Sequence, residues 1–157
     1  MPVYRVEIAF LDKNTDSIGR GIKKGINEDL GISLQNVSYV EVYSIDAQLS
    51  KEEVKEAAEK LLHDPLIQEY KIDKEIQGKF DWVIEVGLHP DVTDNAGMMA
   101  EQAIADVIGR KLREGEGIRM SRKYCIKGRA DEGQIRKICT GMLANSQIEN
   151  FSYRKVN

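Results

Sequence analysis

The segment LLHDPLIQEY (61–70) is repeated, weakly but in order, as MLANSQIENF (142–151). The shift between the two is 142 − 61 = 81 residues, and it places Asp64 on Asn145 and Tyr70 on Phe151. A repeat within one chain usually means that one structural unit is used twice. The two segments therefore predict that this chain is a tandem duplication, and the remaining sequence can be aligned outward from them.

The repeat extends back to the first strand-like stretch. There the shift is 82 − 4 = 78 residues, and it places Asp16 on Asp94 and Gly19 on Gly97. Two runs of alternating apolar residues correspond at this shift, namely Tyr4, Val6, Ile8 and Phe10 with Trp82, Ile84, Val86 and Leu88. A unit of about 78 residues is small to fold alone. We therefore expect two repeats, residues 1–78 and 79–157, packed as one pseudo-dimer.

Both halves have the same predicted order of elements, strand–helix–strand–helix–strand. Alternation of apolar residues predicts strands at 3–10, 36–48, 67–73, 80–88, 118–128 and 148–156. Four residues that favour the N-cap position, Asp16, Ser50, Asp94 and Asp131, precede the predicted helices. The long stretch 36–48 is expected to bend or bulge in its middle. We predict an α+β fold, with helices packed on a mixed or antiparallel sheet and the two units related by a pseudo-two-fold.

Composition excludes several classes of protein. The 157 residues carry a net charge of −3, whereas nucleic-acid binders usually have an excess of positive charge. No apolar run approaches the roughly 18 residues that a membrane span needs. The opening MPVYRVEIAF lacks the layout of a signal peptide, so we expect a cytoplasmic protein that binds neither nucleic acid nor membrane. Cys125 and Cys139 correspond to Ser44 and Ala58, and we expect both to be packed, reduced thiols.

The residues that carry catalysis in most enzymes are scarce. His63 and His89 lack a suitably spaced second histidine or cysteine for a zinc site, and we expect ordinary surface roles for both. The sequence also lacks a glycine-rich phosphate loop. We therefore predict no catalytic residue, no cofactor-binding residue, no metal ligand and no cofactor.

The matching segments DSIG (16–19) and DNAG (94–97) allow two interpretations. The start of a helix beside a glycine can hold an anion. Alternatively, the aspartate caps the helix and repels phosphate, while the glycine lets another backbone approach closely. We favour the second, structural interpretation.

Two charged features are also candidates. Glu7 and Glu85 correspond in the repeat, and paired carboxylates can perform acid–base chemistry where they converge, although we expect a solvated sheet edge instead. The segment RKLREGEGIRMSRK (110–123) collects six cations that could dock an acidic partner.

The order of these residues resembles the small PurS subunit of phosphoribosylformylglycinamidine synthase, in two successive copies. The order, spacing and duplication carry the resemblance together, and it spans nearly the whole chain. The residues concerned are Asp16, Gly19, Tyr43, Leu61, Leu62, Asp64, Ile67 and Tyr70, and then Asp94, Gly97, Tyr124, Met142, Leu143, Asn145, Ile148 and Phe151. VTDNAG, GRKL and LSKEEV are more similar to the tandem region that precedes the catalytic part in fused forms of that enzyme.

The resemblance implies a non-catalytic subunit or domain of an ATP- and glutamine-dependent ligase, an amidotransferase complex of de novo purine biosynthesis. Its partners would be a PurL-type synthetase and a PurQ-type glutaminase, whose docking and ammonia transfer it would support. The family's small subunit forms dimers, so a tandem copy would be a dimer in one chain, and the duplication leaves open whether this chain also forms a homodimer. No catalytic residue of the family falls in this part.

Two other functions remain as alternatives. The first is a tandem module that senses amino acids, with its ligand near residues 14–19 and 93–97. The second is an enzyme with a site between the two copies, which would need converging titratable groups.

Overall fold

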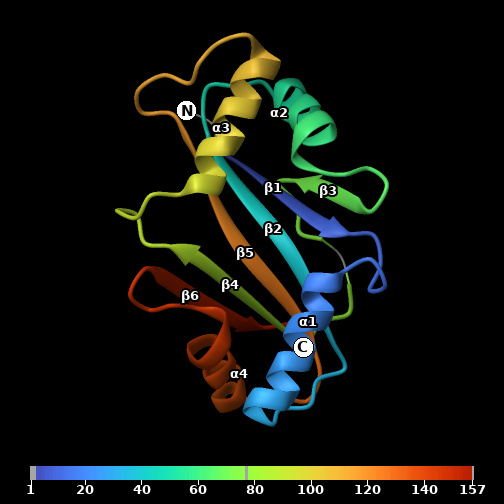
Figure 1. Cartoon of the computed structure of the whole chain (residues 1–157). Coiled ribbons are helices and arrows are strands. Elements are labelled where there is room, and N and C mark those ends of the chain that lie inside the picture. The colour runs from blue at the N-terminus through green and yellow to red at the C-terminus, as the bar shows by residue number, and fades with distance from the viewer. Residues whose placement is uncertain (1–2, 77, 157) are drawn as a thin grey trace. The chain divides into compact units, whose positions relative to one another are not determined.

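In the part of the chain that the structure describes, the fold combines four α-helices with six β-strands (Figure 1). The computed structural model describes residues 3–76 and 78–156. Along the chain the elements are β1 (Val3–Phe10), α1 (Ser17–Leu30), β2 (Asn36–Asp46), α2 (Lys51–Ala57), η1 (Ala58–Leu62), β3 (Gln68–Ile72), β4 (Trp82–Leu88), α3 (Asn95–Ile108), β5 (Gly117–Lys127), α4 (Glu132–Ile138), η2 (Cys139–Leu143) and β6 (Glu149–Lys155). The strands form one sheet in the order β3-β1-β2-β5-β4-β6. The α+β class predicted from the sequence is confirmed.

All four helices begin where the capping residues predict. Ser50 and Glu53 form a complete capping box at the start of α2, and Asp131 and Gln134 form another at the start of α4. The glycines after the two long helices, Gly31 and Gly109, adopt left-handed backbone angles, a conformation that costs glycine little. The sequence therefore defines both ends of these helices.

The second helix of each half ends in a π-turn, which the sequence did not predict. The turn η1 follows α2 and the turn η2 follows α4. Carbonyls in a last turn need new partners. Here the His63 Nδ1 donates to the Ala58 carbonyl at 2.6 Å, and the Ala144 amide donates to the Cys139 carbonyl at 2.9 Å. In each π-turn the first carbonyl, that of Ala58 or Cys139, therefore has a hydrogen-bond donor.

The strands fall within two residues of their predicted bounds. β4 pairs antiparallel with β5 on one side and with β6 on the other, and Ile84 lies opposite Tyr124 and Tyr153. β2, for which we expected a bend or bulge, is assigned as a single strand of 11 residues.

The chain divides into two compact units that do not coincide with residues 1–78 and 79–157. Unit 1 comprises Met1–Ala9, Glu41–Ile76 and Thr93–Met120, and unit 2 comprises Phe10–Val40, Gln77–Val92 and Ser121–Asn157. Each unit therefore contains elements from both halves of the sequence, with one long helix taken from the other half.

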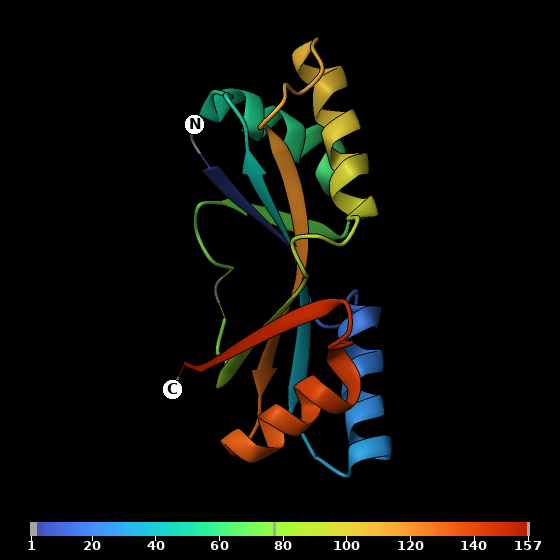
Figure 2. The ribbon, with the colours of Figure 1, turned by 90° about the vertical axis from the view of Figure 1, so that its left-hand side faces the viewer.

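The core of unit 1 lies between its strands and the helices α2 and α3, which contact each other. Figure 2 shows both helices on the same face of these strands. The first half contributes Val6, Ile8, Ile45, Ala47, Leu49, Val54, Ala57 and Ala58, and the second half contributes Ala100, Ile104 and Ile118.

The core of unit 2 lies under the helices α1 and α4, which also contact each other. The first half contributes Ile26, Ile32, Leu34, Val37 and Tyr39. The second half contributes Trp82, Ile84, Val86, Tyr124, Ile126, Ile135, Ile138, Cys139 and Leu143. The rings of Tyr39 and Tyr124 pack against each other in this core, with their centroids 5.7 Å apart.

Candidate functional site

The DSIG turn is filled by its own aspartate. Asp16 is 4% exposed, and its Oδ1 accepts the Gly19 amide at 2.7 Å while its Oδ2 accepts the Tyr39 amide at 2.8 Å. A Cβ on Gly19 would lie 2.1 Å from the Val37 carbonyl oxygen, so only glycine allows β2 to pass this close. The structural interpretation of this turn is confirmed.

The DNAG turn has the same geometry in unit 1. Asp94 accepts the Gly97 and Met120 amides, both at 2.8 Å, and a Cβ on Gly97 would lie 2.3 Å from the Ile118 carbonyl oxygen. In both turns a carboxylate occupies the place that an anion would take. An amino-acid ligand at either turn has no support from this geometry.

Glu7 does not lie at a solvated sheet edge, and that expectation was wrong. Its carboxylate is fully buried, accepts the Ile76 amide at 3.0 Å and pairs with Arg5 at 3.1 Å. The chain beyond β3 returns over this part of the sheet and brings the Ile76 amide to the carboxylate. Glu85 is half-buried and accepts the Ser121 hydroxyl at 2.9 Å. Each carboxylate has a local structural role.

The basic segment 110–123 does not present six available cations. Arg110 pairs with Glu116 at 2.8 Å, Arg122 pairs with Glu149, and Arg119 lies 3.8 Å from Asp94. Lys123 is only 2% exposed. Most of this charge is therefore engaged within the fold, which leaves little of it available for the acidic partner that this segment could have docked.

Glu116 organises the loop between α3 and β5. Its carboxylate accepts from the Arg110 guanidinium, from the Arg113 amide at 2.6 Å and from the Gln48 amide at 2.7 Å. These hydrogen bonds, that from Arg110 first, lower the pKa of Glu116 to about 2. This carboxylate stays ionised at neutral pH and serves the structure.

The remaining reactive residue types are also held by the fold. His63 and His89 each bond a backbone carbonyl, and His63 also contacts the Tyr70 ring edge-on at 4.9 Å. Cys125 and Cys139 are both fully buried, and burial raises the pKa of the Cys139 thiol to about 11. Across residues 3–76 and 78–156, no three histidine, cysteine or acidic side chains are grouped so that they could hold a metal ion.

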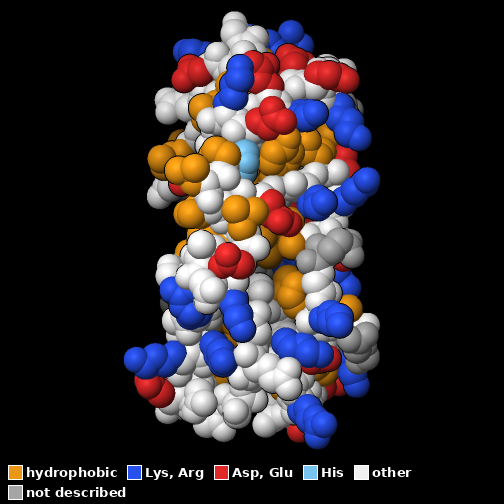
Figure 3. Space-filling model, turned by 90° about the vertical axis from the view of Figure 1, so that its right-hand side faces the viewer, with side chains coloured by type: hydrophobic (Ala, Val, Ile, Leu, Met, Phe, Trp, Pro, Cys, Tyr) orange, Lys and Arg blue, Asp and Glu red, His pale blue; other side chains and the backbone are white. Residues whose placement is uncertain are grey.

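Unit 1 exposes four large apolar side chains, Leu61, Leu66, Met98 and Met99. These side chains are 45%, 85%, 56% and 73% exposed, and η1, which carries Leu61, contacts α3, which carries both methionines. Figure 3 shows hydrophobic side chains gathered on one face. Exposed apolar patches often mark contact surfaces for other proteins, and methionine adapts well to such contacts.

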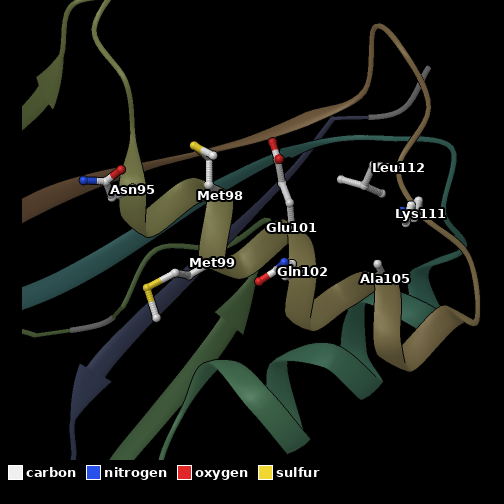
Figure 4. A pocket seen from close by; sticks show the side chains of 8 residues that line it. All are labelled: Asn95, Met98, Met99, Glu101, Gln102, Ala105, Lys111 and Leu112. Carbon is white, nitrogen blue, oxygen red and sulfur yellow. The ribbon is translucent and has the colours of Figure 1, made fainter.

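A hollow of about 640 Å³ adjoins the two methionines (Figure 4). In the close-up, Met98 and Glu101 point to one side of α3 and Met99 points to the other, while Leu112 approaches from the following loop. Our sequence analysis missed this surface. Its signal was the pair of methionines, which align with Arg20 and Gly21 when the two halves of the sequence are compared.

One comparison with known proteins agrees with the resemblance, over the first half of the chain. Residues 3–76 match the family model PurS, described as phosphoribosylformylglycinamidine (FGAM) synthase. The matched segment runs from β1 to just beyond β3. A search of curated proteins found no match. None of the helices in the described part of the chain has the length and apolar character to span a bilayer. The match supports a PurS-like protein with a role in FGAM synthase and purine biosynthesis.

Proposed function

We propose that this chain is a non-catalytic assembly component of FGAM synthase, acting in the cytoplasm. It would hold a PurL-type synthetase and a PurQ-type glutaminase together and support the transfer of ammonia between them. The observation that carries this proposal is the family match over residues 3–76. The engaged carboxylates, histidines and cysteines described above are consistent with a chain that has no catalytic centre of its own.

We further propose that residues 79–157 are a second PurS-like copy. Corresponding residues make corresponding bonds in the two halves. Leu66 donates to Asp64 as Gln147 donates to Asn145, and Asp64 bonds Gln68 as Asn145 bonds Glu149. The two π-turns and the two capping boxes also recur 81 residues apart, since 139 − 58 and 131 − 50 both equal 81.

The composition of the two cores supports a pseudo-dimer within one chain. Each half contributes a long helix to the core that contains the other half's outer strands, with Ile26 of α1 in unit 2 and Ile104 of α3 in unit 1. Exchange of equivalent elements is a common way in which two copies form a dimer. A fused pair would have its dimer interface fixed at synthesis, which suits a scaffold.

Reconstitution tests this function. The chain is co-purified with the synthetase and glutaminase encoded in the same genome, and glutamine-dependent amidine synthesis is measured with and without it. We expect the three to co-elute and the glutamine-dependent activity to require the chain. Because the chain supplies no catalytic group, activity with free ammonia should depend on it much less. No association, together with unchanged glutamine-dependent activity, would contradict the proposal.

A further inference from the structure

Unit 2 contains a small hollow of about 410 Å³ whose lining includes three cations. Lys127, Arg129 and Lys155 line it, together with one carboxylate, Asp81, and one aromatic ring, Trp82. Lys127 ends β5 and Lys155 ends β6, the two neighbours of β4 (Figure 1). We call this feature the basic hollow.

Hydrogen bonds hold the wall of the basic hollow in place. The Trp82 indole N–H donates to the Ala130 carbonyl at 3.0 Å, and Asp81 accepts the Gly128 amide at 2.8 Å. Both bonds fix the turn that follows β5. The Lys155 ammonium lies 6.0 Å from the centre of the Trp82 ring, within the range of a cation–π contact.

Two of the three cations are not paired with a carboxylate of the described residues. The Lys127 ammonium lies 3.7 Å from Asp81, so these two charges largely offset each other. Arg129 and Lys155 are both exposed, and within the described residues neither forms an ion pair. The basic hollow therefore carries a net charge of about +2 on a chain whose total charge is −3.

A hollow of unit 1 that shares three repeat positions with the basic hollow is lined by more carboxylates than cations. The hollow there is lined by Val3, Asp46 and Glu116, which the repeat places on Asp81, Lys127 and Gln35 of the basic hollow, since 81 − 3 = 78, 127 − 46 = 81 and 116 − 35 = 81. It is also lined by Asp94, Glu101 and Arg119. Unit 1 also has a bond equivalent to that of Trp82, from the Tyr4 hydroxyl to the Leu49 carbonyl at 2.9 Å. The repeat thus places Asp46 where unit 2 has Lys127, so the fold does not require a cation at that position.

We propose that the basic hollow receives an acidic segment of the protein partner, with aspartate or glutamate carboxylates pairing with Arg129 and Lys155. This inference rests on the assembly function proposed above. A carboxylate can accept two parallel N–H bonds from a guanidinium, and the two cations come from separate segments, so each can take its own carboxylate. The Gly128 amide, which could otherwise bind a phosphate, is already used by Asp81.

The location of the cations would also orient the partner. The net charge of the whole chain, −3, gives no general attraction for an acidic segment, so the cations of the basic hollow would set where it binds. Charge complementarity of this kind accelerates association and disfavours wrong orientations, and salt weakens it. The hollow in unit 1 offers only one cation, Arg119, which lies by Asp94, so it would not favour the same segment.

The test is a double charge reversal, Arg129→Glu with Lys155→Glu, which leaves Lys127 and Asp81 intact. The matched control is Lys24→Glu with Lys137→Glu, two exposed cations of unit 2 that do not line the hollow. Both variants change the net charge equally. The dissociation constants for the synthetase and the glutaminase are measured over a range of sodium chloride concentrations. A neutral double variant, Arg129→Gln with Lys155→Gln, is measured as well, in case the charge-reversed variant does not fold.

We expect the reversed hollow to weaken binding of one partner at least tenfold at low salt and to flatten its salt dependence, while the control changes the dissociation constant less than about threefold. Equal weakening by the control, or wild-type binding by the variants, would overturn this inference and leave the assembly function intact. Competition by inorganic phosphate beyond its ionic strength would also overturn it, in favour of a small-anion site. If the wild-type chain binds neither partner, the assembly function and this inference fail together.

Discussion

The carboxylate of Asp16 accepts the backbone amide of Tyr39 at 2.8 Å, across 23 residues of sequence. Its other oxygen caps α1 through the Gly19 amide. One buried side chain thus fixes both the start of the helix and its position against β2. Asp94 makes the same two kinds of bond, to Gly97 and Met120.

Removing the Asp16 carboxylate should lower the free energy of unfolding. Asp16→Ala leaves two amides without their acceptor in a buried site, and we expect a loss of about 2–4 kcal/mol in the free energy of unfolding. Asp16→Asn keeps one acceptor oxygen and should lose less. Urea denaturation followed by circular dichroism measures both, with the exposed Asp29→Asn as the control on the same helix. Equal midpoints for Asp16→Ala and Asp29→Asn would contradict this role.

Two glycines of α1 should respond in opposite directions to alanine. Gly19→Ala places a Cβ 2.1 Å from the Val37 carbonyl oxygen, and we expect destabilisation by roughly 2 kcal/mol or more, as for other overpacked sites. Gly21→Ala meets no atom within 4 Å and should stabilise the helix by about 0.5–1 kcal/mol.

Gly97→Ala, whose Cβ would lie 2.3 Å from the Ile118 carbonyl oxygen, should behave like Gly19→Ala. The shift in the midpoint of urea denaturation, relative to the wild type, measures the effect of each of these three variants. A stabilising Gly19→Ala would show that the approach of β2 is not as close as described.

Local signals predicted the elements well because caps and periodicity act within a few residues. Asp16 and Asp131 marked helix starts correctly. The choice of core for each helix could not be predicted this way. Ile26 and Ile104 give α1 and α3 similar apolar faces, and periodicity shows that a face is buried without showing what covers it. Glu7 was misjudged because the amide that satisfies it, from Ile76, is 69 residues away.

Acid should weaken the loop that Glu116 organises. The pKa of Glu116 in the folded chain is about 2, below its usual value of 4.5, because Arg110 and two amides bond the ionised form. Its contribution to stability is therefore complete above about pH 4.5 and is lost as the pH falls towards 2.

We expect Glu116→Gln to lower the urea midpoint at pH 7 and the difference from the wild type to shrink between pH 4.5 and 2. The nearby Glu114→Gln, at an exposed position, is the matched control. A difference that stays constant over this interval would rule out the titration of Glu116 as its source.

Both thiols should be inert in the folded chain. Cys125 and Cys139 are fully buried, and a pKa of about 11 keeps the Cys139 thiol protonated at neutral pH. We expect no reaction with a disulfide reagent at pH 8 until denaturant is added, when two thiols should react. Ser146→Cys, at an exposed position, supplies a positive control. Rapid reaction of the native wild-type chain would disprove this.

Neither half of the sequence should fold as a monomer. Residues 1–78 lack Ala100, Ile104 and Ile118, so the core of unit 1 would be open. They also leave Ile26 and Val37 without the rest of the unit 2 core. We expect this fragment to dimerise or aggregate, whereas the whole chain does not aggregate. Size-exclusion chromatography with light scattering measures both. A well-behaved monomeric fragment would contradict this expectation.

The mixed origin of the two cores constrains how the protein is made. On the ribosome, the core of unit 1 lacks part of its apolar contacts until Ile118 has been synthesised, and the core of unit 2 lacks its share until Leu143. At roughly 5–20 residues per second, Val6 and Ile26 wait several seconds for these partners. During that interval the nascent first half exposes apolar side chains, so chaperones that bind such segments have their opportunity before the second half leaves the exit tunnel.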